Sequence, residues 1–170
     1  MVFSYKEIKF KFFEFIPLFL LLFISLNGTA IIDLKIFSIN VHYILIYYWI
    51  LKKPQALGYG FIFLSGIITD VMFGLPMGLT ALVLLIVAAF ATYVRVVTVR
   101  VSLFSDWMVF IPALLIANVV YFFILYLSDY SIDYFYLFKN SIFTFIFYPV
   151  LWIFFELLIR ITKQESSYVR

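Results

Sequence analysis

Long apolar runs separated by short polar stretches dominate the chain. Six runs have roughly the length that a helix needs to cross a bilayer, which is about 20 residues. We expect spans at 15–32, 36–51, 56–72, 79–94, 103–127 and 141–161, with a polar, aromatic loop at 128–140. The run at 36–51 is short for a full crossing. The pattern predicts an all-α integral membrane protein, a six-helix transmembrane bundle.

The basic residues predict how this bundle is oriented. With the N-terminus in the cytoplasm, ten of the twelve lysines and arginines fall on the inner side, and only Lys35 and Lys139 fall outside. Inner loops of membrane proteins carry this excess of positive charge. We therefore expect both termini in the cytoplasm, with a basic segment at 1–14, a membrane domain at 15–161 and a tail at 162–170.

Composition excludes several classes of protein. Apolar residues make up 66% of the chain and charged residues 12%, against about 45–50% and 25% in soluble proteins. A soluble or disordered chain could not solvate that much apolar surface. The net charge of +3 is explained by basic residues flanking the spans, so no nucleic-acid partner is expected.

Candidates for chemistry are sparse. Cysteine is absent and His42 is the single histidine, so we expect no metal centre and no cofactor. The polar residues are scattered over different spans, so we expect no enzyme activity. His42 is predicted to be solvated at the outer interface, and Tyr47, Tyr48 and Trp49 to form an aromatic belt at the inner one.

The segment from Leu51 to Leu82 carries the most information. Gly58, Gly60 and Gly66 are small residues of the kind that let membrane helices approach closely. Gly74-Leu75-Pro76-Met77-Gly78 is predicted to be a tight outer turn, because proline removes a backbone donor and disfavours helix before it. The turn would make the third and fourth spans an antiparallel hairpin.

Asp70 lies near the outer end of the third predicted span, and two interpretations are open. It could be a buried carboxylate that binds a partner or a cation. The interpretation we favour is a cap on the turn, with the carboxylate accepting from backbone N–H groups of residues 72–78.

Three other polar positions also predict contacts. Glu156 and Arg160 are four residues apart, in the favourable order for a helix ion pair. This pair either neutralises itself near the inner interface or offers a docking point for another membrane helix. Asp106 is expected to cap its helix, and Asn118 should face neighbouring helices because its amide needs partners.

The order of motifs in this segment resembles the MreD rod-shape-determining family. The motifs are Lys52-Lys53-Pro54, Gly58-x-Gly60-Phe61, Gly66-x-x-x-Asp70 and Gly74-x-Pro76-x-Gly78, with Tyr48-Trp49 just before them. The resemblance is sharpest over 47–82. Two positions depart from the family pattern: Ile39-Asn40 stand about where the family tends to have proline, and Thr80 where it often has histidine.

The resemblance implies a non-catalytic component of the bacterial inner membrane that takes part in cell-wall elongation. Implied partners are an MreC-like single-span protein, the MreB filament and the pair of RodA and a transpeptidase. It also implies a six-helix architecture similar to the membrane subunits of energy-coupling vitamin transporters. Separately, the basic residues Lys52, Lys53, Arg95 and Arg100 are expected to lie at anionic membrane lipids.

An alternative function is the substrate-binding membrane subunit of a vitamin or metal transporter. Such a subunit needs a sealed pocket with convergent polar groups. The chain has few polar residues inside its predicted spans, which favours the scaffold over the carrier.

Overall fold

The computed structural model describes residues 15–27, 39–98, 102–130 and 133–167, with side chains as far as Arg160. Within these ranges the chain forms six α-helices and one short 3₁₀ helix, and no strand. The elements in chain order are α2 (Ile16–Asn27), α3 (Val41–Lys52), η2 (Pro54–Ala56), α4 (Tyr59–Phe73), α5 (Leu79–Val97), α6 (Leu103–Leu127) and α7 (Tyr134–Ser167).

Three of the described helices are long and apolar enough to cross a membrane. They are Leu79–Val97, Leu103–Leu127 and Tyr134–Arg160, and α2 and α4 are shorter apolar helices. Large apolar side chains, such as Phe19, Val119 and Phe123, stay exposed on the surface, as expected where lipid is the solvent. These observations support the predicted all-α membrane protein.

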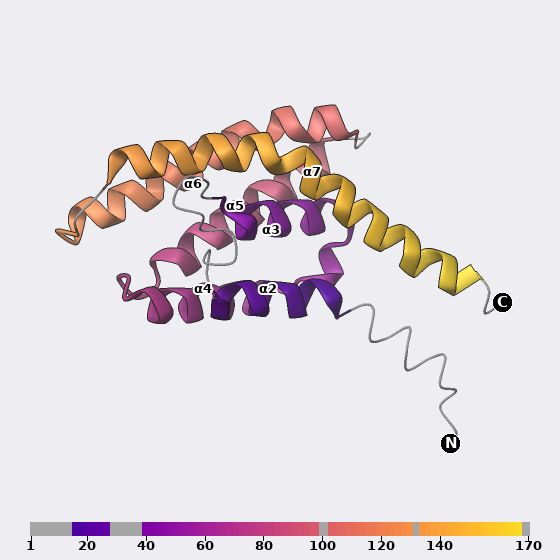
Figure 1. The fold of residues 1–170 in the computed structure, drawn as a ribbon, viewed down its shortest axis with the longest axis horizontal. Helices are drawn as coiled ribbons and strands as arrows, with labels where there is room; N and C mark the ends of the chain where they lie inside the picture. The colour runs from indigo at the N-terminus through magenta and orange to yellow at the C-terminus, as the bar shows by residue number, and fades with distance from the viewer. Residues whose placement is uncertain (1–14, 28–38, 99–101, 131–132, 168–170) are drawn as a thin grey trace, which may run out of the picture.

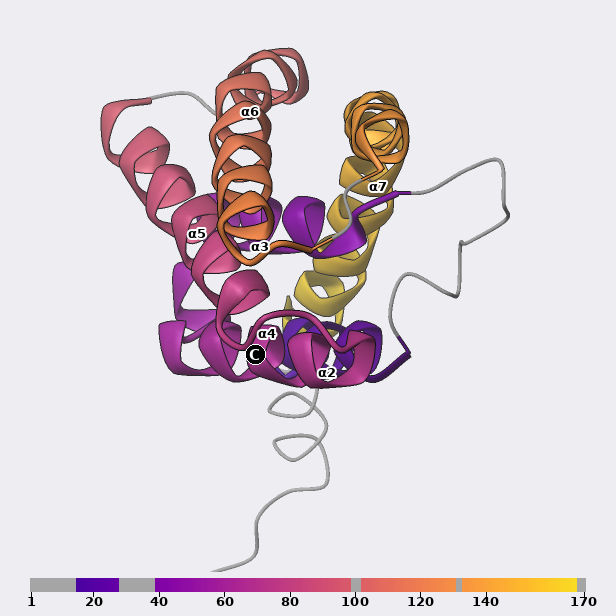
Figure 2. The same ribbon diagram turned by 90° about the vertical axis from the view of Figure 1, so that its left-hand side faces the viewer.

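The helices are arranged around α3 and α5 (Figures 1 and 2). α2 and α4 lie next to each other, and α2 also contacts α3. α5 contacts α3, α4 and α6, while α7 contacts α6 and α3. Figure 2 shows α6 and α7 on the side of α3 that is opposite to α2 and α4. Most of the long helices therefore meet the short central helix α3.

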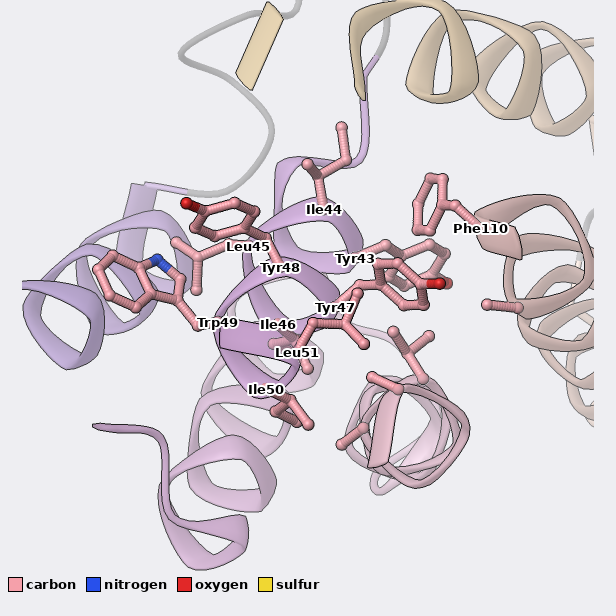
Figure 3. Close-up of a cluster of buried hydrophobic side chains, with 14 of the residues drawn as sticks. Tyr43, Ile44, Leu45, Ile46, Tyr47, Tyr48, Trp49, Ile50, Leu51 and Phe110 are labelled. Atoms are coloured by element: carbon pink, nitrogen blue, oxygen red, sulfur yellow. The ribbon is translucent and has the colours of Figure 1, made fainter. Parts of the chain in front are cut away.

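α3 is the centre of the core. Ten of its twelve residues, from His42 to Leu51, are buried, and their side chains leave the helix in all directions (Figure 3). A helix that is apolar on all sides is one that neighbours surround. Its twelve residues extend about 18 Å, less than the ~30 Å of a bilayer core. α3 is therefore shorter than a straight full crossing, which agrees with the expectation that the run at 36–51 is short for one, and the count of six spans stays a prediction.

The aromatic residues of α3 belong to this core, so the predicted interface belt is wrong for them. Tyr47 and Tyr48 are 0% exposed and Trp49 is 4% exposed. The Tyr47 ring lies 5.0 Å from that of Phe110, which stacks on Tyr148 at 4.7 Å. Stacked and tilted ring pairs of this kind stabilise a core beyond the area they bury.

α7 begins earlier and ends later than the sequence pattern predicts. It starts at Tyr134, so the second half of the expected loop at 128–140 is helical. Asp133 explains this start, because its Oδ1 accepts the backbone N–H of Tyr136 at 3.0 Å, as an N-cap residue does. The helix continues to Ser167, so the boundary expected between 161 and 162 falls inside it.

Candidate functional site

The turn between α4 and α5 is organised by Asp70, whose exposure is 1%. Its Oδ2 accepts the backbone N–H of Gly78 and its Oδ1 that of Thr80, each at 2.9 Å. The carboxylate therefore satisfies two donors at the N-terminus of α5, where negative charge is also favoured by the helix dipole. The predicted turn cap is confirmed: Gly78 is a donor within the expected stretch 72–78, while the second donor, Thr80, lies two residues beyond it.

Two glycines give the turn its shape. Gly74 ends α4 with φ 62° and Gly78 precedes α5 with φ 91°, backbone conformations that glycine adopts without a steric cost. The N–H of Leu75 also returns to the carbonyl oxygen of Asp70 at 2.9 Å. Gly74, Pro76 and Gly78 thus form the tight turn expected, and α4 and α5 pack as a hairpin.

The three glycines on or before α4 differ in what surrounds them. A Cβ on Gly66 would clash with the backbone of Ala81, so α4 and α5 are in backbone contact there, as small residues permit. Among the described residues, a Cβ at Gly60 would meet nothing within 4 Å, and a Cβ at Gly58 would touch only the Phe61 ring at 3.5 Å. The predicted close approach therefore holds for Gly66 and is wrong for Gly58 and Gly60.

A cavity of about 730 Å³ lies at the other end of α4, and we call it the basic cavity. Five residues of the sequence motif, namely Lys52, Lys53, Pro54, Gly58 and Phe61, line it. The other lining residues are Phe15, Ile16, Pro17, Leu18, Trp49, Gln55, Ala56, Arg95 and Leu158. The motif is thus split between the two ends of α4, whose fifteen residues extend about 22 Å.

Glu156 connects α7 to α3 beside this cavity. Its Oε1 lies 3.7 Å from Arg160 Nε, which confirms the predicted ion pair. Its Oε2 accepts the Tyr48 hydroxyl at 3.0 Å and lies 3.8 Å from Lys52 Nζ. The Lys52 ammonium also sits 5.0 Å from the centre of the Trp152 ring. Sequence spacing missed these partners because they are more than a hundred residues apart.

Asp106 and Asn118 both make contacts from α6 to α7. The Trp152 indole N–H donates to Asp106 Oδ2 at 3.3 Å, and Asp106 is buried. The N-cap is Ser102, whose Oγ accepts the N–H of Ser105, so the expected capping role of Asp106 is wrong. Asn118 Nδ2 donates to Ser141 Oγ at 2.9 Å, which confirms that its amide faces a neighbouring helix.

Side chains from five helices line a second cavity of about 340 Å³, the polar pocket. Its lining residues are Asn40, His42, Tyr43, Thr69, Phe73, Leu75, Thr80, Leu84, Asn118, Tyr121, Tyr136, Leu137 and Asn140. Most of them carry a hydroxyl, amide or imidazole group. The expectation that few polar groups converge in the membrane domain is therefore wrong.

His42 also departs from its prediction. It is 3% exposed, and its Nε2 shares a hydrogen bond of 3.1 Å with Ser25 Oγ on α2. The sequence does not indicate this burial. His42 lies near the start of an apolar run, and such a run could equally begin at the membrane surface.

A third concave surface, the apolar groove, runs between α6 and α7 and has a volume of about 490 Å³. It is lined by Ile111, Leu114, Leu115, Asn118, Val119, Phe122, Tyr134, Leu137, Phe138, Ser141, Ile142 and Phe145. Asn118 and Ser141 satisfy each other within it. What remains is an almost entirely apolar surface.

Comparison of the chain with family models, curated protein sequences and solved structures found no match. We therefore infer the function from the sequence motif and from the chemistry of the turn, the two cavities and the groove.

Proposed function

We propose that this protein is a non-catalytic membrane scaffold of the bacterial cell-wall elongation machinery, as its resemblance to the MreD family implies. The observation that carries the proposal is the ordered motif from Lys52 to Gly78. Its partners would be an MreC-like single-span protein, the MreB filament, and RodA with its transpeptidase. The protein would act by holding these partners together in the inner membrane.

The roles of the motif residues support a scaffold. Gly66 sets the distance between α4 and α5, and Asp70 fixes the turn that joins them. Gly74 and Gly78 allow the turn its left-handed backbone. These residues define the geometry of a helical hairpin, which is what a protein that positions others requires.

We also propose the six-span topology with both termini in the cytoplasm. Lys52, Lys53 and Arg95 line the cavity at one end of α4, whereas Asp70 lies at the other. This asymmetry agrees with the excess of basic residues on inner segments. A reporter that is active only outside the membrane, fused after Arg170, should stay inactive, and an active reporter would contradict this topology.

The apolar groove between α6 and α7 is the surface we assign to the single-span partner. Helices associate in membranes through close packing and hydrogen bonds, because lipid is as apolar as the helices themselves. A concave apolar surface offers such packing to one more helix. The exposed side chains of Leu115, Val119 and Ile142 line it.

Recovery of the MreC-like partner on the tagged protein, extracted from host membranes, tests this assignment. Val119→Trp fills the groove, while Val150→Trp adds the same bulk to an α7 position outside it. The two valines are 65% and 59% exposed, so neither change disturbs the core. We expect Val119→Trp alone to reduce recovery of the partner. Equal recovery with both variants would remove the groove from the proposal, and no recovery with the wild type would remove the partnership.

The polar pocket favours a second candidate function, the substrate-binding subunit of a transporter. Its volume of about 340 Å³ falls within the ~300–1,000 Å³ typical of small-molecule sites. The described residues of its lining carry no carboxylate and no ammonium or guanidinium group, so a neutral ligand rich in hydroxyl or amide groups would fit best. A small molecule that co-purifies with the wild type, and is lost in Tyr43→Phe, would favour this function over the scaffold.

A further inference from the structure

We propose that the basic cavity binds the phosphate group of an anionic phospholipid, with an acyl chain lying along its apolar lining. The inference does not depend on the proposed scaffold function. It follows from three features of the cavity: its basic side chains, the N-terminus of α4, and a lining that is part polar and part apolar.

The charge in the cavity is positive. Lys52, Lys53 and Arg95 all line it, and none of its described lining residues is acidic. Glu156 partly neutralises Lys52 at 3.8 Å. Lys53 and Arg95 form no ion pair with any described residue, so two cations face the cavity uncompensated. Such basic pockets between membrane helices suit anionic lipid headgroups.

The N-terminus of α4 adds to this field. Gly58 is its N-cap, and no side chain caps the first turn. Gly58 and Phe61 both line the cavity. The Phe61 N–H already donates to the Gly58 carbonyl oxygen at 3.0 Å, so the dipole of α4 and the remaining N–H groups of its first turn are what would attract a phosphate. The amide of Gln55 lies in the same lining and can donate another hydrogen bond.

A donor beside the cavity is also unsatisfied. The indole Nε1 of Trp49, a lining residue, is buried and has no hydrogen-bond partner among the described residues. Buried donors are nearly always paired in native structures. The Nε1 atom is itself buried away from the cavity, so this donor takes no part in the proposed site, which rests on the basic side chains, the α4 terminus and the apolar lining.

The rest of the lining selects a lipid over a free phosphate ion. Phe15, Leu18, Phe61 and Leu158 contribute apolar surface to the same cavity, and Phe15 and Phe61 are exposed. A free phosphate has nothing to place against these side chains. A phospholipid places its acyl chain there, at the end of helices that lipid already surrounds.

Native mass spectrometry of the full-length protein in detergent tests the proposal. The probes are phosphatidylglycerol, phosphatidylcholine with the same acyl chains, and inorganic phosphate. We expect phosphatidylglycerol to be retained in preference to phosphatidylcholine. We expect Lys53→Gln and Arg95→Gln each to weaken its binding affinity about fivefold and so to lower its occupancy, because one basic side chain near a lipid surface contributes about 1 kcal/mol.

Arg160→Gln is the matched control. Arg160 is an exposed cation next to Glu156, and it is not among the described residues that line the cavity. Its loss should leave occupancy unchanged. Thermal unfolding of the three variants should match the wild type, which separates lost binding from lost structure.

Three results would overturn the proposal. Equal retention of the two lipids would show that the net negative charge of the headgroup is not recognised, because both lipids carry a phosphate. An equal loss in Arg160→Gln would reduce the effect to general surface charge. Displacement of phosphatidylglycerol by inorganic phosphate at comparable concentration would assign the cavity to a soluble ligand.

Discussion

Replacing Asp70 with asparagine removes one acceptor from the turn between α4 and α5 and keeps the shape of the side chain. In the native turn, each carboxylate oxygen accepts one backbone N–H at 2.9 Å. An asparagine has one acceptor oxygen, and its NH₂ group would face the other N–H. That backbone donor would then be left unsatisfied in a buried site.

The cost can be estimated from these contacts. A lost hydrogen bond to a charged group costs about 1.5–3 kcal/mol, and a lost negative charge at a helix N-terminus about 0.3–1 kcal/mol. We therefore expect Asp70→Asn to lower the free energy of unfolding by about 2–4 kcal/mol. Unfolding by SDS in mixed micelles, followed by tryptophan fluorescence, measures this difference.

Asp129→Asn is the matched control, since it makes the same chemical change at an exposed residue. Its backbone has φ 51°, which asparagine tolerates as well as aspartate, so we expect a change within about 0.5 kcal/mol. In cells, Asp70→Asn should lower protein level and partner recovery together. Wild-type stability with lost partner recovery would refute the turn cap as the main role of Asp70.

Further predictions concern close helix contacts and buried hydroxyl groups. Gly66→Ala should lower the free energy of unfolding by about 1–3 kcal/mol, because the new Cβ would clash with the backbone of Ala81. Gly60→Ala should leave the free energy of unfolding unchanged or raise it in the same SDS titration. Tyr47→Phe removes a buried hydroxyl without a described partner and should be neutral or stabilise by about 1 kcal/mol. Tyr48→Phe should lower the free energy of unfolding by about 1–2 kcal/mol, because it breaks the hydrogen bond to Glu156. If Tyr47→Phe proved more destabilising than Tyr48→Phe, the packing of α3 described above would be contradicted.

Features that depend on neighbouring residues could be predicted from the sequence. The turn needs only Asp70, Gly74, Pro76 and Gly78, which follow one another closely, so its cap and shape were predictable. The start of α7 also depends only on neighbouring residues. Asp133 is an ordinary N-cap residue, and attention to it would have moved the predicted start of the last span from 141 to 134.

Features that depend on the assembly of several helices could not be predicted in this way. A helix surrounded by lipid and a helix buried in protein have the same apolar sequence pattern. The sequence of residues 41–52 therefore does not show that other helices enclose α3. The polar pocket brings together residues from five helices. Glu156 pairs with Lys52, which lies more than a hundred residues earlier in the chain. Helical spacing relates only residues a few positions apart, so it cannot predict this pair.

Cell width after depletion of this protein in its own host tests the central claim most directly. Width would be measured by microscopy, with and without added vitamins and metals. The scaffold function predicts that rods widen or become round despite the supplements. Cells that keep their shape but stop growing until a supplement is added would contradict it and would indicate the transporter subunit instead.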